Sequence, residues 1–557
     1  MLVVVPVGLL LGYWAARHRQ PQQPASVGEQ PSRAGYEVFV LPSTEKVLPG
    51  AGLPSGATAG PARVSLARNE AESVQIVLRS RTALRQVQVE VGGLAQADGS
   101  GRIPQEAIAW SPVGFVKTKR PAYAVSHVGW WPDPLLAAAP FDVRPGWPQP
   151  IWVTVQAGPD TPPGTYEGVI TIRPVDHPAT HIRLVARVWG FALPATPSLQ
   201  SAFDVYLNQL ESGYSRFFPA WWAVWKSRPD ELSQRFYDRL IHERLSPMLH
   251  LTLGDEGTLT ALRRLREQGL SAFAIGRHGG SFDNKWPDEP AELARLESEY
   301  REEARRLREA GLLDRHYIYL YDEPEPGLPK VAEVARMIHR ADPSLKTLVT
   351  LDKPFNLDQL TNWFQDIDIV CLRDVILDPA QAARLQQMGK QVWLYVSGPT
   401  PPYPSLVIDA PAMAVRMLPW MCWKYGLGGL LYWSVNYWTT DPYQEPMNTP
   451  WQQNGNGSLF YPGPDGPVSS IRLETLRDGM EDYEYLAHLS GIVHAARAGG
   501  RTGPALLEEA GRLLRVDPTL VASMRNYTVQ TDVLQNRRAA VARMIERLQA
   551  LLISPGS

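Results

Sequence analysis

Cysteine is nearly absent from this 557-residue chain, which holds only Cys371 and Cys422. Two cysteines exclude a disulfide framework and a cysteine-based metal cluster. Both lie in apolar runs, so we expect them to be small buried hydrophobes. The formal net charge is only −2, and the basic residues form no concentrated patch. This charge distribution argues against nucleic acid as a partner.

Motifs of several common enzyme classes are also missing. No histidines recur at metal-ligand spacing, no glycine-rich phosphate loop follows a predicted strand, and no Gly-x-Ser-x-Gly sequence occurs. These absences argue against metal, nucleotide and serine-hydrolase chemistry. We therefore expect no cofactor.

The first residues of the chain suggest export. Leu2–Ala16 is an apolar stretch followed by Arg17, His18 and Arg19. It is short for a membrane span but suits the core of a signal peptide. No basic segment precedes it, so an uncleaved membrane anchor is the alternative. Residues 20–34 are rich in Pro and Gln and predict a disordered tether. We expect an exported protein that is extracellular, periplasmic or anchored with its folded part facing outward.

The length predicts two or three domains after residue 34. Over 35–197 short apolar runs alternate with turn signals, and no long amphipathic helix intervenes, which predicts a β-sandwich. The strands expected there are Glu37–Leu41, Ser73–Arg79, Val87–Val91, Ile151–Gln156, Tyr166–Arg173 and Ile182–Trp189.

Strand and helix patterns then alternate over 198–490, which predicts a (β/α)8 barrel of the TIM type. The expected strands are Ala202–Tyr206, Pro247–Leu253, Ala272–Gly276, Tyr317–Asp322, Thr347–Leu351, Ile367–Leu372, Val392–Val396 and Gly429–Val435. The eighth helix is expected to begin near Ser470. Residues 491–557 predict a C-terminal helical extension that packs on the barrel.

The stretch Tyr317–Pro326 contains the main candidate for chemistry. Its alternation predicts a buried strand, with Ile318 and Leu320 toward the helices and Tyr319, Tyr321 and Glu323 toward the barrel interior. Pro324 ends the strand and biases Glu323 toward an extended conformation. Asp322 and Glu323 therefore lie at the carboxyl end of the fourth strand, where barrel enzymes build active sites.

Asp322 and Glu323 would point to opposite faces of an undistorted strand. For both carboxylates to reach one pocket, the strand must twist or bulge just before Pro324, as strands often do beside active sites.

Adjacent carboxylates on a barrel suggest glycoside hydrolysis, with Asp322 and Glu323 as the catalytic residues. The seventh strand ends in Tyr395-Val396-Ser397 and supplies no nucleophilic carboxylate. One solution is that the 2-acetamido group of the substrate attacks the anomeric carbon, while one carboxylate orients it and the other protonates the leaving oxygen. The alternative is a conventional second carboxylate from Asp352, Asp374 or Asp204.

Aromatic and polar residues at the ends of the other strands are candidates for substrate binding, because aromatic faces stack on pyranose rings and amides bond hydroxyls. The predicted substrate-binding residues are Tyr321, Tyr395, Trp433, Asn436, Trp438, His278 and Asp352.

Several motifs between residues 36 and 490 resemble glycoside hydrolase family 123 and relatives catalogued as domain of unknown function 4091. They are Ala67–Gln75, Trp131–Leu135, Pro163–Gly168, Tyr321–Pro324, Gly428–Trp433 and Ile471–Tyr485. The resemblance implies a β-sandwich before a catalytic barrel and β-N-acetylgalactosaminidase activity by substrate assistance. It assigns Asp322 to orienting the acetamide and Glu323 to acid catalysis.

Two other functions stay open at this stage. One is a glycosidase for a different sugar that uses Asp352 or Asp374, and the other is a non-catalytic glycan-binding envelope protein. The charged residues of Ile471–Tyr485 recur at helical spacing and predict intrahelical ion pairs in a structural helix under the barrel.

Overall fold

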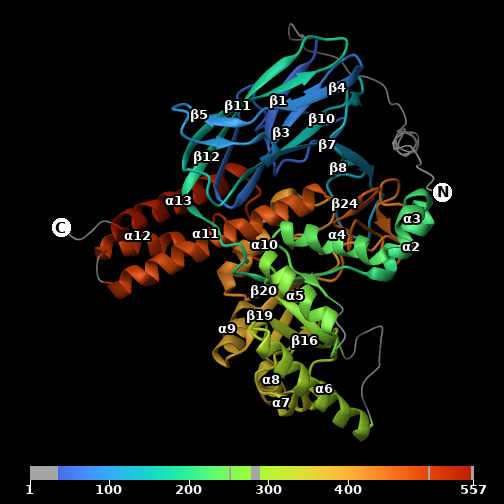
Figure 1. The fold of residues 1–557 in the computed structure, drawn as a ribbon, viewed down its shortest axis with the longest axis vertical. Coiled ribbons are helices and arrows are strands. Elements are labelled where there is room, and N and C mark those ends of the chain that lie inside the picture. The colour runs from blue at the N-terminus through green and yellow to red at the C-terminus, as the bar shows by residue number, and fades with distance from the viewer. Residues whose placement is uncertain (1–34, 250–252, 278–288, 500–501, 554–557) are drawn as a thin grey trace.

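A computed structural model describes residues 35–249, 253–277, 289–499 and 502–553. An all-β body lies against a barrel, with helices between them (Figure 1). The predicted fold class is confirmed. The predicted signal or anchor segment lies outside the described residues. None of the helices in the described ranges is both long and apolar enough to cross a lipid bilayer.

The β-sandwich consists of two mainly antiparallel sheets. The first sheet has the order β1 (Glu37–Pro42), β3 (Glu70–Arg79), β10 (Gln149–Ala157), β7 (Ile108–Lys117) and β8 (Trp130–Leu135). The second has the order β2 (Ala62–Arg68), β12 (Thr180–Ala192), β11 (Gly164–Arg173), β4 (Leu84–Val91) and β9 (Phe141–Val143), with β5 (Leu94–Gln96) and β6 (Arg102–Ile103) beside it. Among the strands not predicted, β8 contains two prolines, which fits its place at a sheet edge.

Eight parallel strands form the barrel, close to the predicted positions. They are β13 (Gln200–Asp204), β14 (Pro247–Met248), β15 (Phe273–Arg277), β16 (His316–Tyr321), β17 (Thr347–Leu351), β18 (Ile369–Arg373), β19 (Gln391–Val396) and β20 (Gly429–Tyr432). The ladder runs β14-β13-β20-β19-β18-β17-β16-β15, and within the described residues no ladder joins β14 to β15. The barrel is therefore nearly closed.

Alternate residues of these strands separate two apolar clusters. The barrel interior holds Tyr317, Tyr319, Leu348, Cys371 and Tyr395 among others. The intervening residues join the larger helix-facing core with the surrounding helices. Cys371 and Cys422 are both buried and free, as predicted.

The helices around the barrel begin at recognisable sequence signals. Asp255, Asn356 and Asp378 accept backbone N–H groups at three helix starts, and proline occupies the first turn of several others. The helices are α4 (Pro229–His242), α5 (Glu256–Gln268), α6 (Pro290–Glu309), α7 (Pro329–Ala341), α8 (Leu357–Gln365), α9 (Pro379–Gln387), α10 (Ala412–Tyr425) and α11 (Ile471–Gly499). Helices α2 (Leu207–Phe217) and α3 (Pro219–Trp225) after β13 were not predicted. The Asn, Gly and Ser residues of α2 and the three Trp residues of α3 have weak helix propensity.

The connection from β20 to α11 is long and carries two hairpins, β21 (Met447–Asn448) with β22 (Gln453–Asn454) and β23 (Tyr461–Gly463) with β24 (Gly466–Val468). After α11 follow α12 (Pro504–Leu514), the hairpin β25 (Val521–Ser523) with β26 (Asn526–Tyr527), and α13 (Thr531–Ile553). Gly190 of β12 donates its N–H to Glu546 of α13 over 2.7 Å. The extension packs on α10 and α11 of the barrel, as predicted, and α13 also packs on β12 of the sandwich (Figure 1).

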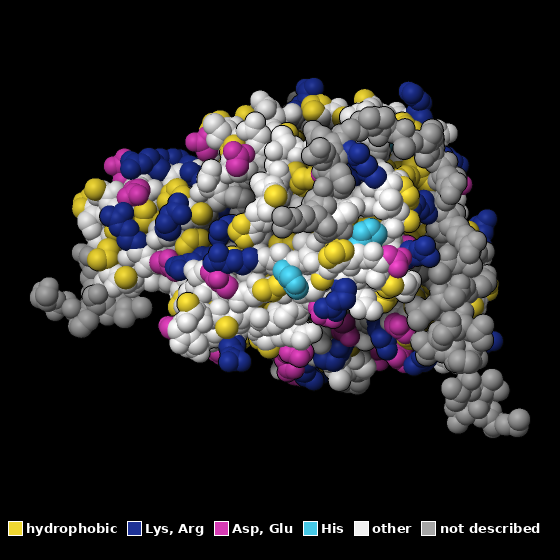
Figure 2. All heavy atoms as spheres, turned by 90° about the horizontal axis from the view of Figure 1, so that it is seen from above, with side chains coloured by type: hydrophobic (Ala, Val, Ile, Leu, Met, Phe, Trp, Pro, Cys, Tyr) yellow, Lys and Arg dark blue, Asp and Glu magenta, His cyan; other side chains and the backbone are white. Residues whose placement is uncertain are grey.

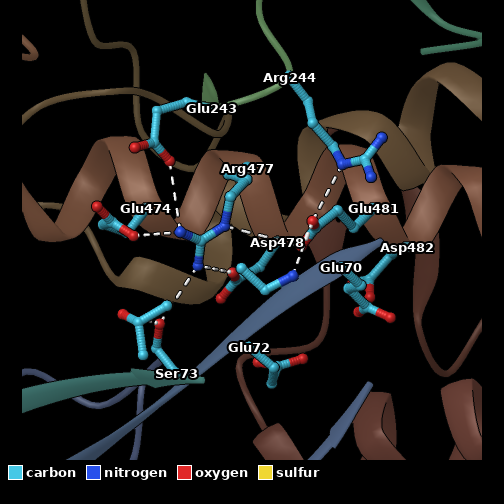
Figure 3. A network of polar contacts seen from close by, with 12 residues as sticks. Glu70, Glu72, Ser73, Glu243, Arg244, Glu474, Arg477, Asp478, Glu481 and Asp482 are labelled. Atoms are coloured by element: carbon cyan, nitrogen blue, oxygen red, sulfur yellow. Dashed lines mark hydrogen bonds and ion pairs between the residues drawn. The ribbon is translucent and has the colours of Figure 1, made fainter. Parts of the chain in front are cut away.

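A buried network of charges joins the two bodies (Figure 3). Arg416 of α10 is fully buried and bonds both carboxylate oxygens of Glu72 in β3 at 3.1 Å each. It also bonds Asp482 of α11 at 2.9 and 3.1 Å. Arg477 of α11 contacts Glu474 within its own helix but also Glu243 after α4. The predicted intrahelical pairs are therefore only part of a network that connects sandwich, barrel and C-terminal helices.

Replacing Arg416 with Met should destabilise the protein by about 3–5 kcal/mol, because buried carboxylates lose their cation. Urea unfolding measured by tryptophan fluorescence tests this expectation. Arg301→Met is the matched control, since Arg301 forms an exposed i,i+4 pair with Glu297 and should leave the midpoint almost unchanged. Equal midpoints for Arg416→Met and wild type would show that the network does not stabilise the fold.

The described residues on one face of the molecule show no single field of charge. On the face seen in Figure 2, Lys and Arg side chains lie among Asp and Glu. This distribution agrees with the absence of a concentrated basic patch in the sequence.

Candidate active site

A bulge in β16 brings Asp322 to the barrel interior. Tyr319 pairs with Leu348 of β17, but the register then shifts and Tyr321 pairs with Val349. Tyr319 and Leu348 belong to the interior cluster, whereas Val349 and Tyr321 pack in the helix-facing core. The residue after Tyr321 therefore points inward. The bulge predicted just before Pro324 is present.

Hydrogen bonds hold the Asp322 carboxylate on this inner side. The Tyr319 hydroxyl donates to Asp322 Oδ1 over 2.8 Å, and Thr350 Oγ1 donates to the same oxygen over 3.2 Å. Thr350 Oγ1 also lies 3.0 Å from the Tyr319 hydroxyl. Two neighbouring strands thus fix one oxygen of the carboxylate.

The Glu323 side chain also reaches the barrel interior, but through an unusual backbone conformation. Its φ is 55°, in the left-handed region, so the predicted extended conformation is wrong. That conformation is uncommon for a non-glycine residue, and here the Glu323 N–H donates to Thr350 Oγ1 over 3.0 Å. The Tyr395 hydroxyl of β19 donates to Glu323 Oε1 over 2.6 Å. The backbone turn therefore places the two adjacent carboxylates beside each other on the barrel interior.

The environment of Glu323 favours its protonated form. Burial raises its pKa, and the negative charges of Asp322 and Asp352 raise it further. The hydrogen bond from Tyr395 and the charge of Arg373 act in the opposite direction, and the net pKa is raised. A carboxyl group with a raised pKa is suited to donate a proton, so Glu323 has the electrostatics of a general acid.

The three alternative carboxylates lie in different surroundings. Asp352 follows β17, close enough to act on Glu323, and its buried Oδ1 has no hydrogen-bond donor among the described residues. Asp374 is 2% exposed on a small separate cavity with Ser397 and Tyr432, and burial raises its pKa to about 7. Asp204 is buried in the interior, where its charge acts on a tyrosine of β16. Of the three, Asp352 is the one placed beside the carboxylate pair.

Aromatic side chains cluster after β20. The ring of Trp433 lies 5.0 Å from that of Tyr437, 5.4 Å from Trp451 and 6.1 Å from Tyr206. Trp451 is 40% exposed, and Trp433 and Tyr437 are half-buried. These rings form an accessible apolar surface of the kind on which sugars stack. Trp451 was not predicted, because it lies in the long β20–α11 connection and carries no motif.

Three predicted substrate-binding residues pack against or bond to other parts of the protein instead. Trp438 is 3% exposed in the helix-facing core and donates its indole N–H to Ser458 Oγ and the Phe460 carbonyl at 3.0 Å each. Asn436 is fully buried and exchanges two hydrogen bonds of 2.9 Å with the backbone of Tyr206.

Tyr321 packs in the helix-facing core because the bulge reverses its side. The structure thus contradicts a substrate contact for Trp438 and Asn436 and the inward orientation of Tyr321. His278 lies outside the described residues. No group of three or more His, Cys, Asp and Glu suited to a metal ion occurs in the described ranges.

Two family models match the chain. The model of the glycoside hydrolase 123 catalytic domain matches residues 297–489, which include Asp322 and Glu323. The model of the glycoside hydrolase 123 N-terminal domain matches residues 64–174, within the sandwich. Together they cover more than half of the chain. No curated protein is similar enough in sequence to count as a match.

Solved structures of similar fold include a family 123 glycoside hydrolase from Clostridium perfringens, described as acting in glycolipid glycan hydrolysis. It is 13% identical, with a TM-score of 0.65 over 92% of this chain and 97% of its own. A family 39 glycoside hydrolase from Bacteroides cellulosilyticus aligns at 10% identity and a TM-score of 0.37, over 71% of this chain and 82% of its own. The first similarity supports the shared fold, and the second is too weak to support a conclusion.

Proposed function

Because this chain belongs to glycoside hydrolase family 123, we propose that it cleaves a terminal 2-acetamido-2-deoxy sugar, of the β-N-acetylgalactosaminide kind, with retention and with assistance from the substrate. The observation that supports this proposal is the placement of Asp322 and Glu323 side by side by the bulge and the left-handed turn. No carboxylate occurs in Ser397–Thr400, directly after β19, where a conventional nucleophile is expected.

Each residue has a defined part in the proposed reaction. The Asp322 carboxylate accepts the acetamide N–H, and the acetamide oxygen attacks the anomeric carbon. Glu323 donates its proton to the leaving oxygen as that bond breaks. Glu323 then removes a proton from the water that opens the oxazolinium ring, and the free sugar leaves with its anomeric configuration retained. Tyr319 and Thr350 hold Asp322 in position, and Tyr395 orients Glu323.

A second candidate function is supported by the position of Asp352. This carboxylate lies beside Glu323 and has a buried oxygen without a donor among the described residues. It could serve as the second carboxylate in a conventional glycosidase acting on a sugar without an acetamide group.

A panel of chromogenic glycosides distinguishes these functions. The purified protein is assayed with nitrophenyl N-acetylgalactosaminide, nitrophenyl N-acetylglucosaminide and the matching plain hexosides. Hydrolysis restricted to the acetamido sugars supports the proposal, and preference for plain hexosides supports the Asp352 mechanism. Binding of sugars without hydrolysis of any substrate would support a non-catalytic glycan-binding protein.

Replacing Tyr395 with Phe should alter the pH profile of the enzyme. The Tyr395 hydroxyl stabilises the Glu323 carboxylate, so its removal raises the pKa of Glu323 further. A general acid loses activity as the pH rises through its pKa, so the alkaline limb of kcat/KM should move to higher pH. The kcat at the optimum should fall roughly tenfold through the lost positioning hydrogen bond.

Tyr317→Phe is the control for this experiment, because the Tyr317 hydroxyl lies in the barrel interior and has no hydrogen-bond partner among the described residues. Tyr317→Phe should leave the alkaline limb of the kcat/KM profile at the wild-type pH. An unchanged limb in Tyr395→Phe would show that this hydroxyl does not act on the catalytic acid.

We also propose that the protein is exported, on the basis of the apolar segment Leu2–Ala16 and the polar residues 20–34 behind it. Deleting residues 1–34 should leave a soluble protein that unfolds cooperatively and keeps its hydrolytic activity. Circular dichroism and size-exclusion chromatography measure this outcome. Aggregation with loss of cooperative unfolding would assign the segment to the fold.

A further inference from the structure

Trp451 lies at the tip of the β21–β22 hairpin and is 40% exposed, more than any other tryptophan in the described ranges. Its ring lies 5.4 Å from that of Trp433 and 5.5 Å from that of Tyr437, and both of these residues are half-buried. Tryptophan usually packs into a core, because its large apolar surface is costly to expose to water. The exposed ring of Trp451 therefore has apolar surface available to a ligand.

The tip of the hairpin is held from two sides. The Thr449 N–H donates to Thr439 Oγ1, in the connection that follows β20, over 3.0 Å. The Gln452 carbonyl accepts from the Ala122 N–H over 3.3 Å, and Ala122 belongs to the connection between β7 and β8 of the sandwich. Because the backbone is bonded on both sides of Trp451, little conformational entropy remains to be lost when a ligand binds there.

The sandwich also holds the base of the hairpin. Asn454 is fully buried and donates an Nδ2–H to the Lys119 carbonyl over 2.9 Å. The Asn454 N–H donates to the Tyr123 hydroxyl over 3.2 Å, and this hydroxyl donates to Asp409 Oδ1 over 2.6 Å. Lys119 and Tyr123 precede β8, so a segment of the sandwich fixes where the hairpin lies relative to the barrel.

The hairpin lies on the same rim of the barrel as the carboxylate pair. Gln453 follows two residues after Trp451. A Cβ atom at Gly398, after β19, would lie 3.3 Å from Gln453 Nε2 and 3.1 Å from Arg373 Nη2, so these two side chains meet at that glycine. Arg373 is close enough to Glu323 for its positive charge to act against the raised pKa of that carboxyl. Gln453 and Arg373 thus connect the hairpin to Glu323 and place N–H donors along this rim.

Only one part of the proposed substrate can extend to this rim. Cleavage of a terminal sugar places its anomeric carbon beside Asp322 and Glu323 on the barrel interior, and the leaving group is what remains attached to that carbon. An aromatic face flanked by N–H donors recognises a neutral sugar ring, because the C–H face packs on the aromatic ring and the hydroxyl oxygens accept hydrogen bonds. The leaving group that suits Trp451 is therefore itself a sugar.

We propose that Trp451 determines leaving-group specificity by stacking on a neutral sugar ring that is linked directly to the sugar being released. This assignment rests on the proposed function and deepens it, since it requires a saccharide leaving group instead of a lipid, a peptide or a simple alcohol. Trp451 contacts the substrate but takes no part in bond cleavage. Its loss should therefore weaken binding of the ground state and the transition state alike.

Two substrates with similarly poor leaving groups test this contact. One is methyl β-N-acetylgalactosaminide, and the other is a disaccharide in which N-acetylgalactosamine is β-linked to galactose. Glu323 must protonate an alcohol oxygen in both, but only the disaccharide carries a second ring. Trp451→Ala should lower kcat/KM for the disaccharide roughly tenfold, mainly through a higher KM, because the apolar contact with that ring is lost. The methyl glycoside should be hydrolysed at the wild-type rate.

Two further variants distinguish stacking from a disturbed hairpin. Trp451→Phe keeps an aromatic face and should retain most of the activity on the disaccharide. Gln452→Ala is the matched control, because Gln452 is exposed at the same tip and has no ring, so both substrates should react as in the wild type. A loss that Trp451→Phe does not restore, or an equal loss in Gln452→Ala, overturns the proposal.

The same measurements separate the sugar contact from the proposed function. If Trp451→Ala lowers hydrolysis of both substrates equally, or of neither, the contact with the leaving group is wrong while hydrolysis of acetamido sugars stands. If the wild-type protein hydrolyses neither substrate, the proposed function is rejected and the leaving-group assignment is rejected with it.

Discussion

Replacing Glu323 with Gln should reduce hydrolysis of a glycan with a poor leaving group by about 10²–10⁴-fold, with little effect on folding. Gln keeps the shape of the side chain and can still accept from the Tyr395 hydroxyl, but it cannot donate the proton that the leaving oxygen needs. The loss should be much smaller for a nitrophenyl glycoside, because nitrophenolate leaves without protonation. Steady-state kcat/KM on both substrate types measures the difference.

Glu325→Gln is the matched control for this variant. Glu325 is an exposed carboxylate two residues further along the chain and pairs with Lys353, so its neutralisation should leave both rates close to wild type. Equal losses for good and poor leaving groups in Glu323→Gln would remove Glu323 from the role of general acid.

Replacing Asp322 with Asn should reduce turnover by about 10²–10³-fold for good and poor leaving groups alike, the scale expected when a preorganised electrostatic partner of the transition state is lost. The reason is that the negative charge of Asp322 stabilises the developing oxazolinium in both cases. Binding of a thiazoline that mimics this intermediate should weaken in parallel, which calorimetry can measure.

The same substitution should shift the pH profile in a defined direction. The charge of Asp322 contributes to the raised pKa of Glu323, so its removal lowers that pKa. The alkaline limb of kcat/KM should therefore move to lower pH, opposite to the shift expected for Tyr395→Phe. A variant that hydrolyses nitrophenyl N-acetylgalactosaminide at the wild-type rate would exclude substrate assistance through Asp322, and Asp352→Asn would then be the variant to assay.

The amino-acid sequence alone determined the architecture and the location of the carboxylate pair. Alternation in Tyr317–Leu320 separates interior from helix-facing residues, since successive side chains of a strand point to opposite faces. The proline after Glu323 marks the end of the strand, and a barrel collects the ends of its strands on one face. Such signals are local, so they can be recognised without knowing which distant residues each side chain contacts.

Only the tertiary structure decided which side chains reach the site. Trp433 and Trp438 follow the same strand. Trp438 is buried because its ring packs against Gly213 of α2, whereas Trp433 is half-buried and packs against the exposed Trp451. Asn436 bonds the backbone of Tyr206, some 230 positions away in the chain. Such contacts depend on distant segments and leave no periodic trace near the residue itself.

The conformation of Asp322 and Glu323 depends on both the local sequence and the tertiary structure. Local alternation required a distortion before Pro324, because Asp322 and Glu323 would otherwise face apart. The conformation of this distortion depended on two neighbouring strands. Thr350 of β17 bonds both the Asp322 carboxylate and the Glu323 backbone, and Tyr395 of β19 bonds the Glu323 carboxylate. The sequence determined that two acids meet at the strand end, and the neighbouring strands determined their conformation, since a left-handed backbone persists only where surrounding contacts hold it.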